Sequence, residues 1–123
     1  ITLDIELDPQ IPDIQADEEK LGQAFINLLL NALEASPADS QIQIRSHYRD
    51  QNGRITEVVI SDKGCGVPEK HLSDIFKPFF TTKTTGTGLG LSNVRRIAEA
   101  HDGQIEVENL RDGGAAFKMS LPL

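Results

Sequence analysis

The sequence predicts an α+β fold, a two-layer α/β sandwich in which about three helices cover one face of a mixed, mostly antiparallel sheet of about five strands. Two observations indicate this fold class. Short segments alternate apolar and polar residues with period two, whereas two longer segments follow the helical period of 3.6, and strand-like segments flank both of them in the chain. The strand-like segments are Ile1–Leu7, Ile42–Tyr48, Thr56–Ser61, Gln104–Glu108 and Ala115–Leu121.

The first third of the chain predicts a strand, a turn and a long helix. A strand over Ile1–Leu7 is followed by a proline-containing turn, and by Asp13–Ala16, which we expect to form a short second strand. Asp17 is a favourable N-cap, and the two glutamates after it suit the positive end of a helix dipole. The helical period continues to Ala35, and Ser36-Pro37 ends it.

The rest of the chain predicts two hairpins with helical segments between them. Ile42–Tyr48 and Thr56–Ser61 alternate like strands around turn-forming residues, and therefore predict a hairpin. A short helical stretch, Glu69–Phe76, and a glycine-rich loop lead to a helix from about Leu89 to His101. Asp102-Gly103 stops this helix, and the last two strand-like segments follow around a Gly-Gly turn.

Composition favours a single soluble, globular domain. The 123 residues are 38% hydrophobic and 25% charged, and the formal net charge of −7 argues against nucleic acid as a partner. The longest apolar run, Ala24–Leu33, is far shorter than the ~20 residues of a membrane helix, so we expect no direct membrane contact. The single Cys65 forms no internal disulfide, and the first residues lack the basic start of a signal peptide. A cytoplasmic location follows as the expectation.

The glycine-rich loop indicates phosphate binding. Gly86, Gly88 and Gly90 alternate with other residues directly before a helical pattern, after a run of hydroxyl residues that contains Lys83. Glycine lets backbone approach a ligand closely, and a helix N-terminus offers free N–H groups and a positive dipole end. Because the chain is acidic, a bound polyanion would need a divalent cation and placed cations such as Lys83.

A polar stripe on the first long helix is a second candidate site. Asn27, Asn31 and Glu34 are spaced i, i+4 and i+7, and the apolar residues Ile26 and Leu30 flank them. A buried amide without a partner costs roughly 1–3 kcal/mol, so a ligand, a hydrated metal or backbone must meet these groups. The alternative is that both Asn side chains bond to backbone or water at the helix edge.

The third candidate site follows the strand that ends at Ser61. In Asp62-Lys63-Gly64-Cys65-Gly66 the carboxylate can accept hydrogen bonds from an exocyclic amine, and the glycines let a planar ring lie close to the backbone. Asp and Gly are also common turn residues, so a turn without a ligand is the alternative for this segment taken alone.

The order of these motifs resembles the ATP-binding catalytic domain of sensor histidine kinases. That domain has the Bergerat, or GHKL, fold of type II topoisomerase, heat-shock chaperone and mismatch-repair ATPases. The resemblance covers nearly the whole chain, and the residues of the motifs are most similar to those of the nitrogen-regulation and sporulation types of kinase. The matching motifs are the N box Asn27–Ala32, the G1 box Asp62–Gly66, the F box Phe76–Phe80 and the G2 box Gly86–Leu91.

The resemblance implies roles for both ends of a nucleotide. Asp62 would bind the adenine amino group, and Gly64 and Gly66 would let the ring pack beside the backbone. Asn27 and Asn31 would hold Mg²⁺ and phosphate oxygens, with the choice of metal ligand between them left open.

The resemblance also implies a mobile lid over the phosphates. Phe76, Phe79 and Phe80 would anchor this lid to the core or to a neighbouring domain, with plain core packing as their alternative role. The residues that would contact the phosphates are Lys83, Gly86, Thr87, Gly88, Leu89 and Gly90, with the neighbouring Thr hydroxyls.

Three positions depart from the family pattern. Glu34 stands where many relatives place a Lys toward the phosphates, and Ala116 stands where relatives often have a Thr near the adenine. Asp102-Gly103 replaces a more usual Gly-Gly, which we interpret as an adjustment of the turn. Two other classes of nucleotide-binding protein are excluded, since the chain has neither a P-loop motif nor a Rossmann G-x-G-x-x-G.

The expected function is phosphoryl transfer to a histidine outside the chain. Hydrolytic members of the Bergerat group resemble one another in a Glu base one helical turn before the metal-binding Asn, and this chain has Asn27 there, so we expect no acid or base among its own residues. His47, His71 and His101 lie outside any long amphipathic hairpin, and we expect them to be structural.

Residues 1–123 are therefore expected to be one catalytic domain of a longer two-component histidine kinase. It would bind Mg-ATP without phosphorylating itself, and would serve a separate dimerisation and phosphoacceptor domain and a downstream response regulator. A nucleotide-binding regulatory module, and an anti-sigma-type Ser/Thr kinase of the same fold, remain the alternatives.

Overall fold

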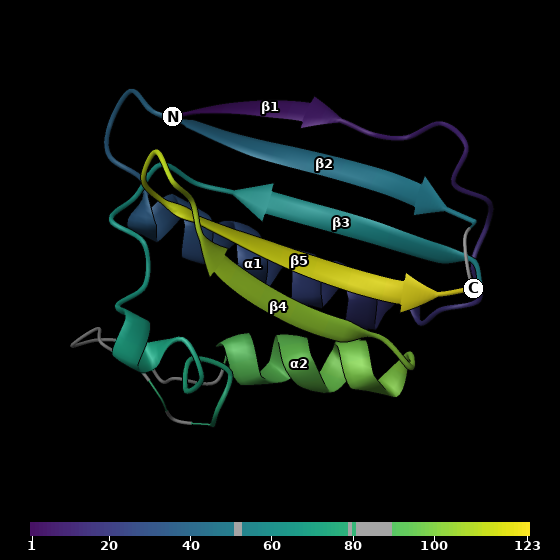
Figure 1. Cartoon of the computed structure of the whole chain (residues 1–123). Helices are drawn as coiled ribbons and strands as arrows, with labels where there is room; N and C mark the ends of the chain where they lie inside the picture. The colour runs from purple at the N-terminus through teal and green to yellow at the C-terminus, as the bar shows by residue number, and fades with distance from the viewer. Residues whose placement is uncertain (51–52, 79, 81–89) are drawn as a thin grey trace.

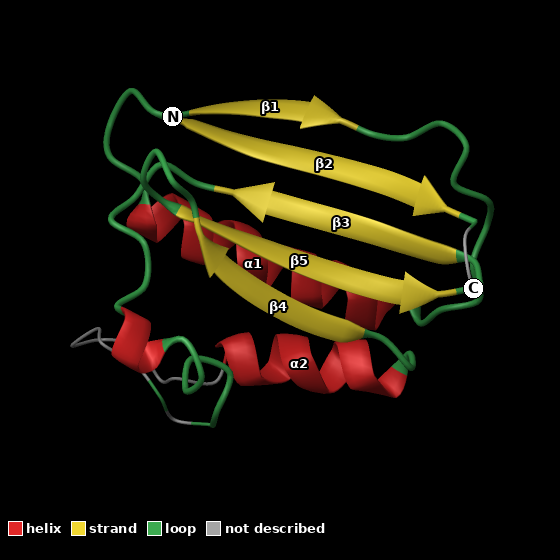
Figure 2. Cartoon of the chain, in the orientation of Figure 1, coloured by secondary structure: helices red, strands yellow, loops and turns green. Residues whose placement is uncertain are grey.

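The computed structural model describes residues 1–50, 53–78, 80 and 90–123. Five strands, two α-helices and one 3₁₀ helix are formed in this part of the chain (Figure 2). In chain order they are β1 (Thr2–Glu6), α1 (Glu18–Ala35), β2 (Gln41–Arg49), β3 (Ile55–Ser61), the 3₁₀ helix η1 (Glu69–His71), α2 (Gly90–Ala100), β4 (Gln104–Asn109) and β5 (Ala115–Pro122).

The strands form one mixed sheet with the order β1-β2-β3-β5-β4. β1 runs parallel to β2, and the other three pairings are antiparallel. Figure 1 shows α1 and α2 on the same side of this sheet, with α1 behind β5 and β4. The predicted two-layer α+β sandwich is thereby confirmed.

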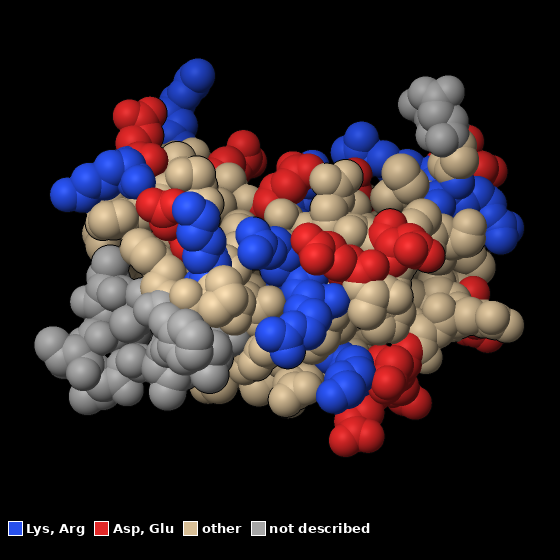
Figure 3. Space-filling view, turned by 90° about the horizontal axis from the view of Figure 1, so that it is seen from below, with Lys and Arg blue, Asp and Glu red and all other residues tan. Residues whose placement is uncertain are grey.

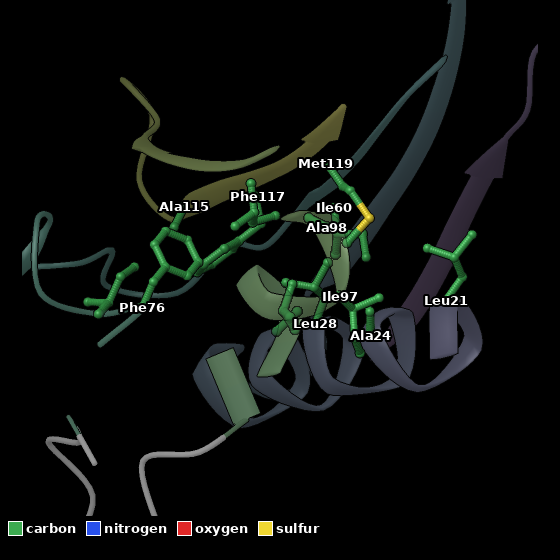
Figure 4. Packing of buried hydrophobic residues seen from close by; sticks show 14 of the residues in the cluster. Leu21, Ala24, Leu28, Ile60, Phe76, Ile97, Ala98, Ala115, Phe117 and Met119 are labelled. Carbon is green, nitrogen blue, oxygen red and sulfur yellow. The ribbon is translucent and has the colours of Figure 1, made fainter. Parts of the chain in front are cut away.

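The core lies between the helices and the sheet (Figure 4). The side chains of Leu28, Phe117 and Met119 are at most 2% exposed. Burying a side chain of this size stabilises the fold by about 1.5–3 kcal/mol. Each layer contributes to the cluster, which includes Leu21, Ala24, Leu28 and Ala32 of α1, Val94, Ile97 and Ala98 of α2, and Ile60, Phe117 and Met119 of the sheet.

Helix α1 begins where the sequence predicts. The N-cap Asp17 accepts a hydrogen bond at Oδ1 from the backbone N–H of Lys20, 3.1 Å away. At the other end, Ser36 donates its N–H to the carbonyl of Ala32. Pro37 follows at once, and a proline there cannot continue the helix.

The expected strand over Asp13–Ala16 is wrong, because these residues lie in a loop. The side chain of Asp8 ties the start of this loop to β2, accepting the N–H of Gln10 (2.9 Å) and of Tyr48 (2.8 Å). Ile14 packs against the core cluster from the loop, which explains the apolar alternation without a ladder.

The predicted helix Glu69–Phe76 is also shorter than expected. Only Glu69–His71 is a 3₁₀ helix, and turns follow it up to Phe76. No helix in the parts of the chain named above is long and apolar enough to cross a membrane.

Candidate functional site

Asp62 is held rigidly at the end of β3. It is 2% exposed, and its N–H donates to the carbonyl of Ala115 over 3.0 Å. Its carboxylate accepts the N–H of Gly64 (2.8 Å) and the N–H of Ala115 (3.2 Å), both at Oδ1. The backbone of β5 and of the loop after β3 therefore fixes the direction of this carboxylate.

The two glycines of the G1 box are needed by the protein itself. A Cβ at Gly64 would lie 2.5 Å from the carbonyl oxygen of Ala35, at the end of α1. Gly66 has a φ of +78°, and a Cβ there would lie 2.7 Å from Oδ1 of Asn109. Packing inside the chain thus requires both glycines, whether or not a planar ring also lies against them.

Two residues that lie beside this loop are not predicted as site residues from the sequence. Asn109, at the end of β4, accepts the N–H of Val67 at Oδ1 (2.7 Å) and donates from Nδ2 to the carbonyl of Val67 (2.6 Å). Gly114 has a φ of +89°, and a Cβ there would lie 2.0 Å from the carbonyl oxygen of Asp62. In the sequence, only the Gly113-Gly114 pair points to this region, and it predicts an ordinary turn because the contact of Gly114 with Asp62 is not visible there.

The asparagine stripe of α1 faces the start of α2. Asn27 and Asn31 are half-buried, and Asn27 donates from Nδ2 to the carbonyl of Gly90 over 3.5 Å, a long contact. Asn31 lies one turn further along α1, toward the end that contacts Gly64. The stripe therefore runs between the first residue of α2 and the G1 box.

Much of the predicted lid lies outside the described residues. This holds for Phe79, Lys83, Gly86, Thr87, Gly88 and Leu89. Gly90 is described, and a Cβ at this position would meet no atom of the other described residues within 4 Å, in contrast to Gly64 and Gly66.

The described F-box aromatics pack on the domain. Phe76 is buried and meets Phe117 edge-on, with ring centroids 6.1 Å apart. Phe80 is half-buried and tilts over the ring of His71 at 5.1 Å. For Phe76 the packing in the core, which was the alternative role, is therefore observed, and an additional role as lid anchor stays a prediction.

A groove of about 560 Å³ opens between the N-terminal part of α1, up to Gln23, and α2 from Asn93 onward. Asp17, Lys20, Arg96 and His101 are among the residues that line it. Lys20 and Gln23, which line the groove from α1, lie 15 and 12 residues before Ala35, so the groove is roughly 18–23 Å along the helix from the end that meets the G1 box. Figure 3 shows acidic and basic side chains intermixed on the face seen from below.

His101 fastens the two helices together beside this groove. Its Nε2 accepts the backbone N–H of Asp17 (3.0 Å), and its Nδ1 lies 2.8 Å from the carbonyl of Ile97. In the tautomer that carries its proton on Nδ1, the second contact is a hydrogen bond from the ring to the carbonyl of Ile97.

Two amide side chains of α1 are the candidate cation ligands predicted from the sequence. The described residues contain no group of three or more His, Cys, Asp or Glu side chains that could hold a metal ion. Asn27 and Asn31 offer side-chain carbonyl oxygens, which suit a hard cation that keeps part of its water shell.

Comparison with known proteins identifies the family. Residues 16–123 match the model of histidine kinase-, DNA gyrase B- and HSP90-like ATPases. The signal transduction histidine-protein kinase AtoS of Escherichia coli is 44% identical over 119 residues, which are 96% of this chain and 19% of AtoS. Sporulation kinase C of Bacillus subtilis is 38% identical over 110 residues, covering 89% of this chain and 25% of that kinase. The nucleotide-free catalytic domain of histidine kinase ThkA superposes with a TM-score of 0.87 at 38% identity, over 98% of this chain and 78% of that one.

The chain belongs to the family of histidine kinase-, DNA gyrase B- and HSP90-like ATPases. Its curated relatives are sensor and sporulation kinases, so the predicted type of ATP-binding domain is confirmed. The chain spans about a fifth of the length of AtoS and a quarter of sporulation kinase C.

Proposed function

We propose that this chain is the catalytic domain of a two-component histidine kinase, a transferase that binds Mg-ATP and donates the γ-phosphoryl group to a histidine on a separate dimerisation domain. The single observation that carries this proposal is the convergence of three sequence motifs in space. Asn27 of α1 contacts Gly90 at the start of α2. Ala35, the last residue of α1, meets Gly64 of the G1 box.

The adenine end of the ATP would meet Asp62. Both backbone hydrogen bonds that the described residues donate to its carboxylate end on Oδ1, so Oδ2 would accept the exocyclic amino group. A hydrogen bond to an ionised acceptor is stronger than a neutral one, and the rigid carboxylate needs no reordering when the ligand arrives. Gly64 and Gly66 would let the adenine ring lie beside the backbone of the loop.

The phosphate end would lie over the asparagine stripe and the start of α2. Asn27 and Asn31 would hold Mg²⁺ and phosphate oxygens, and the positive dipole end of α2, which begins at Gly90, favours negative charge. Lys83, Gly86, Thr87, Gly88, Leu89 and Gly90 would close over the phosphates. Because the chain carries a formal charge of −7, Mg²⁺ would supply much of the compensation.

The reaction needs positioning more than acid–base chemistry. In phosphoryl transfer, electrostatic stabilisation and alignment of the attacking group supply most of the acceleration. Asn27 stands where the hydrolytic relatives have a Glu base, so this site is suited to holding ATP until an external nucleophile arrives. His47 in β2, His71 in η1 and His101 beside α1 do not offer that nucleophile, and a dimerisation domain of the same kinase would.

Two similar structures support the ligand and the partner. The full-length kinase ShkA, 28% identical with a TM-score of 0.84, was solved in complex with AMPPNP. Kinase ThkA, 35% identical with a TM-score of 0.79, was solved in complex with the response regulator protein TrrA. We infer the same kinds of ligand and downstream partner for this chain, with the site in the cytoplasm.

The decisive experiment supplies the missing nucleophile. The chain is mixed with the dimerisation domain of its own kinase, Mg²⁺ and γ-labelled ATP, and the label on the acceptor is tested for acid stability. We expect acid-labile phosphohistidine on the acceptor and no label on the chain alone. Tight ATP binding without transfer would favour a nucleotide-binding regulatory module, and acid-stable label would favour a Ser/Thr kinase of the same fold.

A further inference from the structure

We propose that Asn109 is a positioning residue of the ATP site, which holds the loop of residues 62–67 in the shape that adenine recognition needs. This inference rests on the proposed function, and it concerns a residue outside the four motifs. Asn109 would not touch the nucleotide and would act through the backbone of Val67.

The contact between Asn109 and Val67 satisfies both polar groups of one residue's backbone. Oδ1 accepts the N–H of Val67 over 2.7 Å, and Nδ2 donates to its carbonyl over 2.6 Å. A primary amide carries a donor and an acceptor in one plane, which matches this pair of groups. Such a two-point contact fixes the direction of the backbone as well as its distance.

The other end of the loop is fixed by the strand opposite. Asp62 donates its N–H to the carbonyl of Ala115 over 3.0 Å, and Ala115 donates its own N–H to Oδ1 of Asp62 over 3.2 Å. Ala115 and Asn109 are register partners in the β4–β5 pairing. A single pair of opposed residues in that hairpin therefore holds both ends of the glycine loop.

The backbone of the loop between these two anchors has little room to move. Gly66 adopts a φ of +78°, and a Cβ there would approach Oδ1 of Asn109 to 2.7 Å. Glycine backbone is intrinsically free to move, so the fixed shape must come from its anchors. Loss of the Asn109 anchor would release Val67 and Gly66, and with them the surface against which the ring would pack.

The test compares Asn109→Ala with Glu108→Ala, a control on the neighbouring exposed residue of β4. Hydrogen exchange at the Val67 amide, measured by NMR without nucleotide, reports the anchor itself. Calorimetric titration with ATP and with inorganic triphosphate separates the adenine end from the phosphate end. We expect Asn109→Ala to lose the protection of Val67 and to bind ATP about 10-fold more weakly, as for the loss of two neutral hydrogen bonds, with triphosphate affinity changed less than about 2-fold.

A second variant guards against misfolding. Asn109→Asp keeps the size of the side chain and the acceptor for the Val67 N–H, and replaces only the donor with an oxygen that faces the Val67 carbonyl. We expect the same selective loss of ATP affinity. Variants that bind ATP as tightly as the wild type, or that lose ATP and triphosphate equally, would overturn the role of Asn109 alone. A wild-type chain that binds no ATP would overturn the proposed function, and this role with it.

Discussion

At the scale of single residues, the carboxylate of Asp62 accepts both of its backbone hydrogen bonds through one oxygen. We therefore predict that Asp62→Asn keeps the fold, because the amide oxygen can still serve Gly64 and Ala115. The second oxygen becomes an NH₂ group, which repels an exocyclic amine. ATP affinity should fall about 10- to 100-fold, as for the loss of a hydrogen bond to a charged group, while inorganic triphosphate is unaffected. Calorimetric titration with both ligands measures the difference.

The control for this prediction is Asp62→Ala, which removes the acceptor for the Ala115 N–H as well. A buried N–H without a partner costs roughly 1–3 kcal/mol, so this variant should also lose stability toward urea. Equal losses of ATP and triphosphate affinity in Asp62→Asn would remove the adenine role from Asp62.

The G1 box illustrates what local sequence can and cannot predict at this scale. Asp62 and its glycines stand out because a turn after a buried strand needs those residue types. The sequence offers a ligand as the reason for Gly64 and Gly66, whereas the structure adds contacts with Ala35 and Asn109. The partner of Val67 is 42 residues away in the chain, and no local pattern reports a contact at that separation.

At the scale of elements, two neighbouring residues form the turn after α2, one with a left-handed backbone and the other with a hydrogen bond that caps the helix. Asp102 has a φ of +60°, and Gly103 donates its N–H to the carbonyl of Ala98 over 2.8 Å. A non-glycine residue in the left-handed region is strained, so we predict that Asp102→Gly stabilises the protein by about 0.5–1 kcal/mol. Urea unfolding followed by circular dichroism would measure this gain.

The matched change is Gly103→Ala, which should act in the opposite direction. A Cβ at Gly103 would lie 2.2 Å from the carbonyl oxygen of Ser120 in β5, and rigid backbone cannot yield to it. We expect a loss of more than about 2 kcal/mol, since overpacking against backbone forces the turn away from the sheet. If both substitutions were neutral, this turn would not set the position of α2.

The loop between β1 and α1 gives the fold a specific dependence on pH. Hydrogen bonds from the backbone N–H of Gln10 and then of Tyr48, with a smaller effect of the nearby His47, hold the pKa of Asp8 below its ordinary value. A carboxyl with a lowered folded-state pKa adds stability that is fully present above its unfolded pKa. This stability is lost as pH falls through the folded value.

We therefore predict that Asp8→Asn lowers the Tm at pH 7, because the amide keeps only one acceptor for two backbone donors. The Tm difference from the wild type should narrow below about pH 4, the ordinary range for Asp, and close at lower pH. Calorimetric scans from pH 7 down to pH 3 would follow it. Asp13→Asn, an exposed change in the same loop, is the control, and a pH-independent difference for Asp8→Asn would contradict the assignment.

Elements themselves were predicted well where periodicity was long. The eighteen residues of α1 present a continuous apolar face and a capping Asp17, so both ends were found within a residue. The prediction of a strand over Asp13–Ala16 was wrong because Ile14 packs on the core from a loop. Over so short a segment, the tertiary burial of one residue gives the same alternation as a strand.

At the scale of the whole molecule, fold class followed from the sequence because each layer has its own period. Buried residues of the helices recur with helical spacing, and those of β5 alternate from Phe117 to Leu121. The strand order β1-β2-β3-β5-β4 could not be derived in this way. It depends on pairings such as that of Ser61 with Ala116, which join distant parts of the chain.

The charge of the whole chain leads to the last prediction. A formal net charge of −7 opposes the approach of a polyanion, so ATP should stabilise the protein only when Mg²⁺ accompanies it. At an ATP concentration of 100 Kd, the expected gain is about 2.7 kcal/mol, visible as a rise in Tm that EDTA abolishes. Asn31→Ala should keep the fold, since Asn31 is half-buried on the helix surface, and should reduce the Mg²⁺-dependent part of the rise. Leu30→Ala, an adjacent change at a side chain 51% exposed, should leave that part intact. A rise in Tm that persists in EDTA would contradict the role of the metal, and full Mg²⁺ dependence in Asn31→Ala would contradict the role of Asn31.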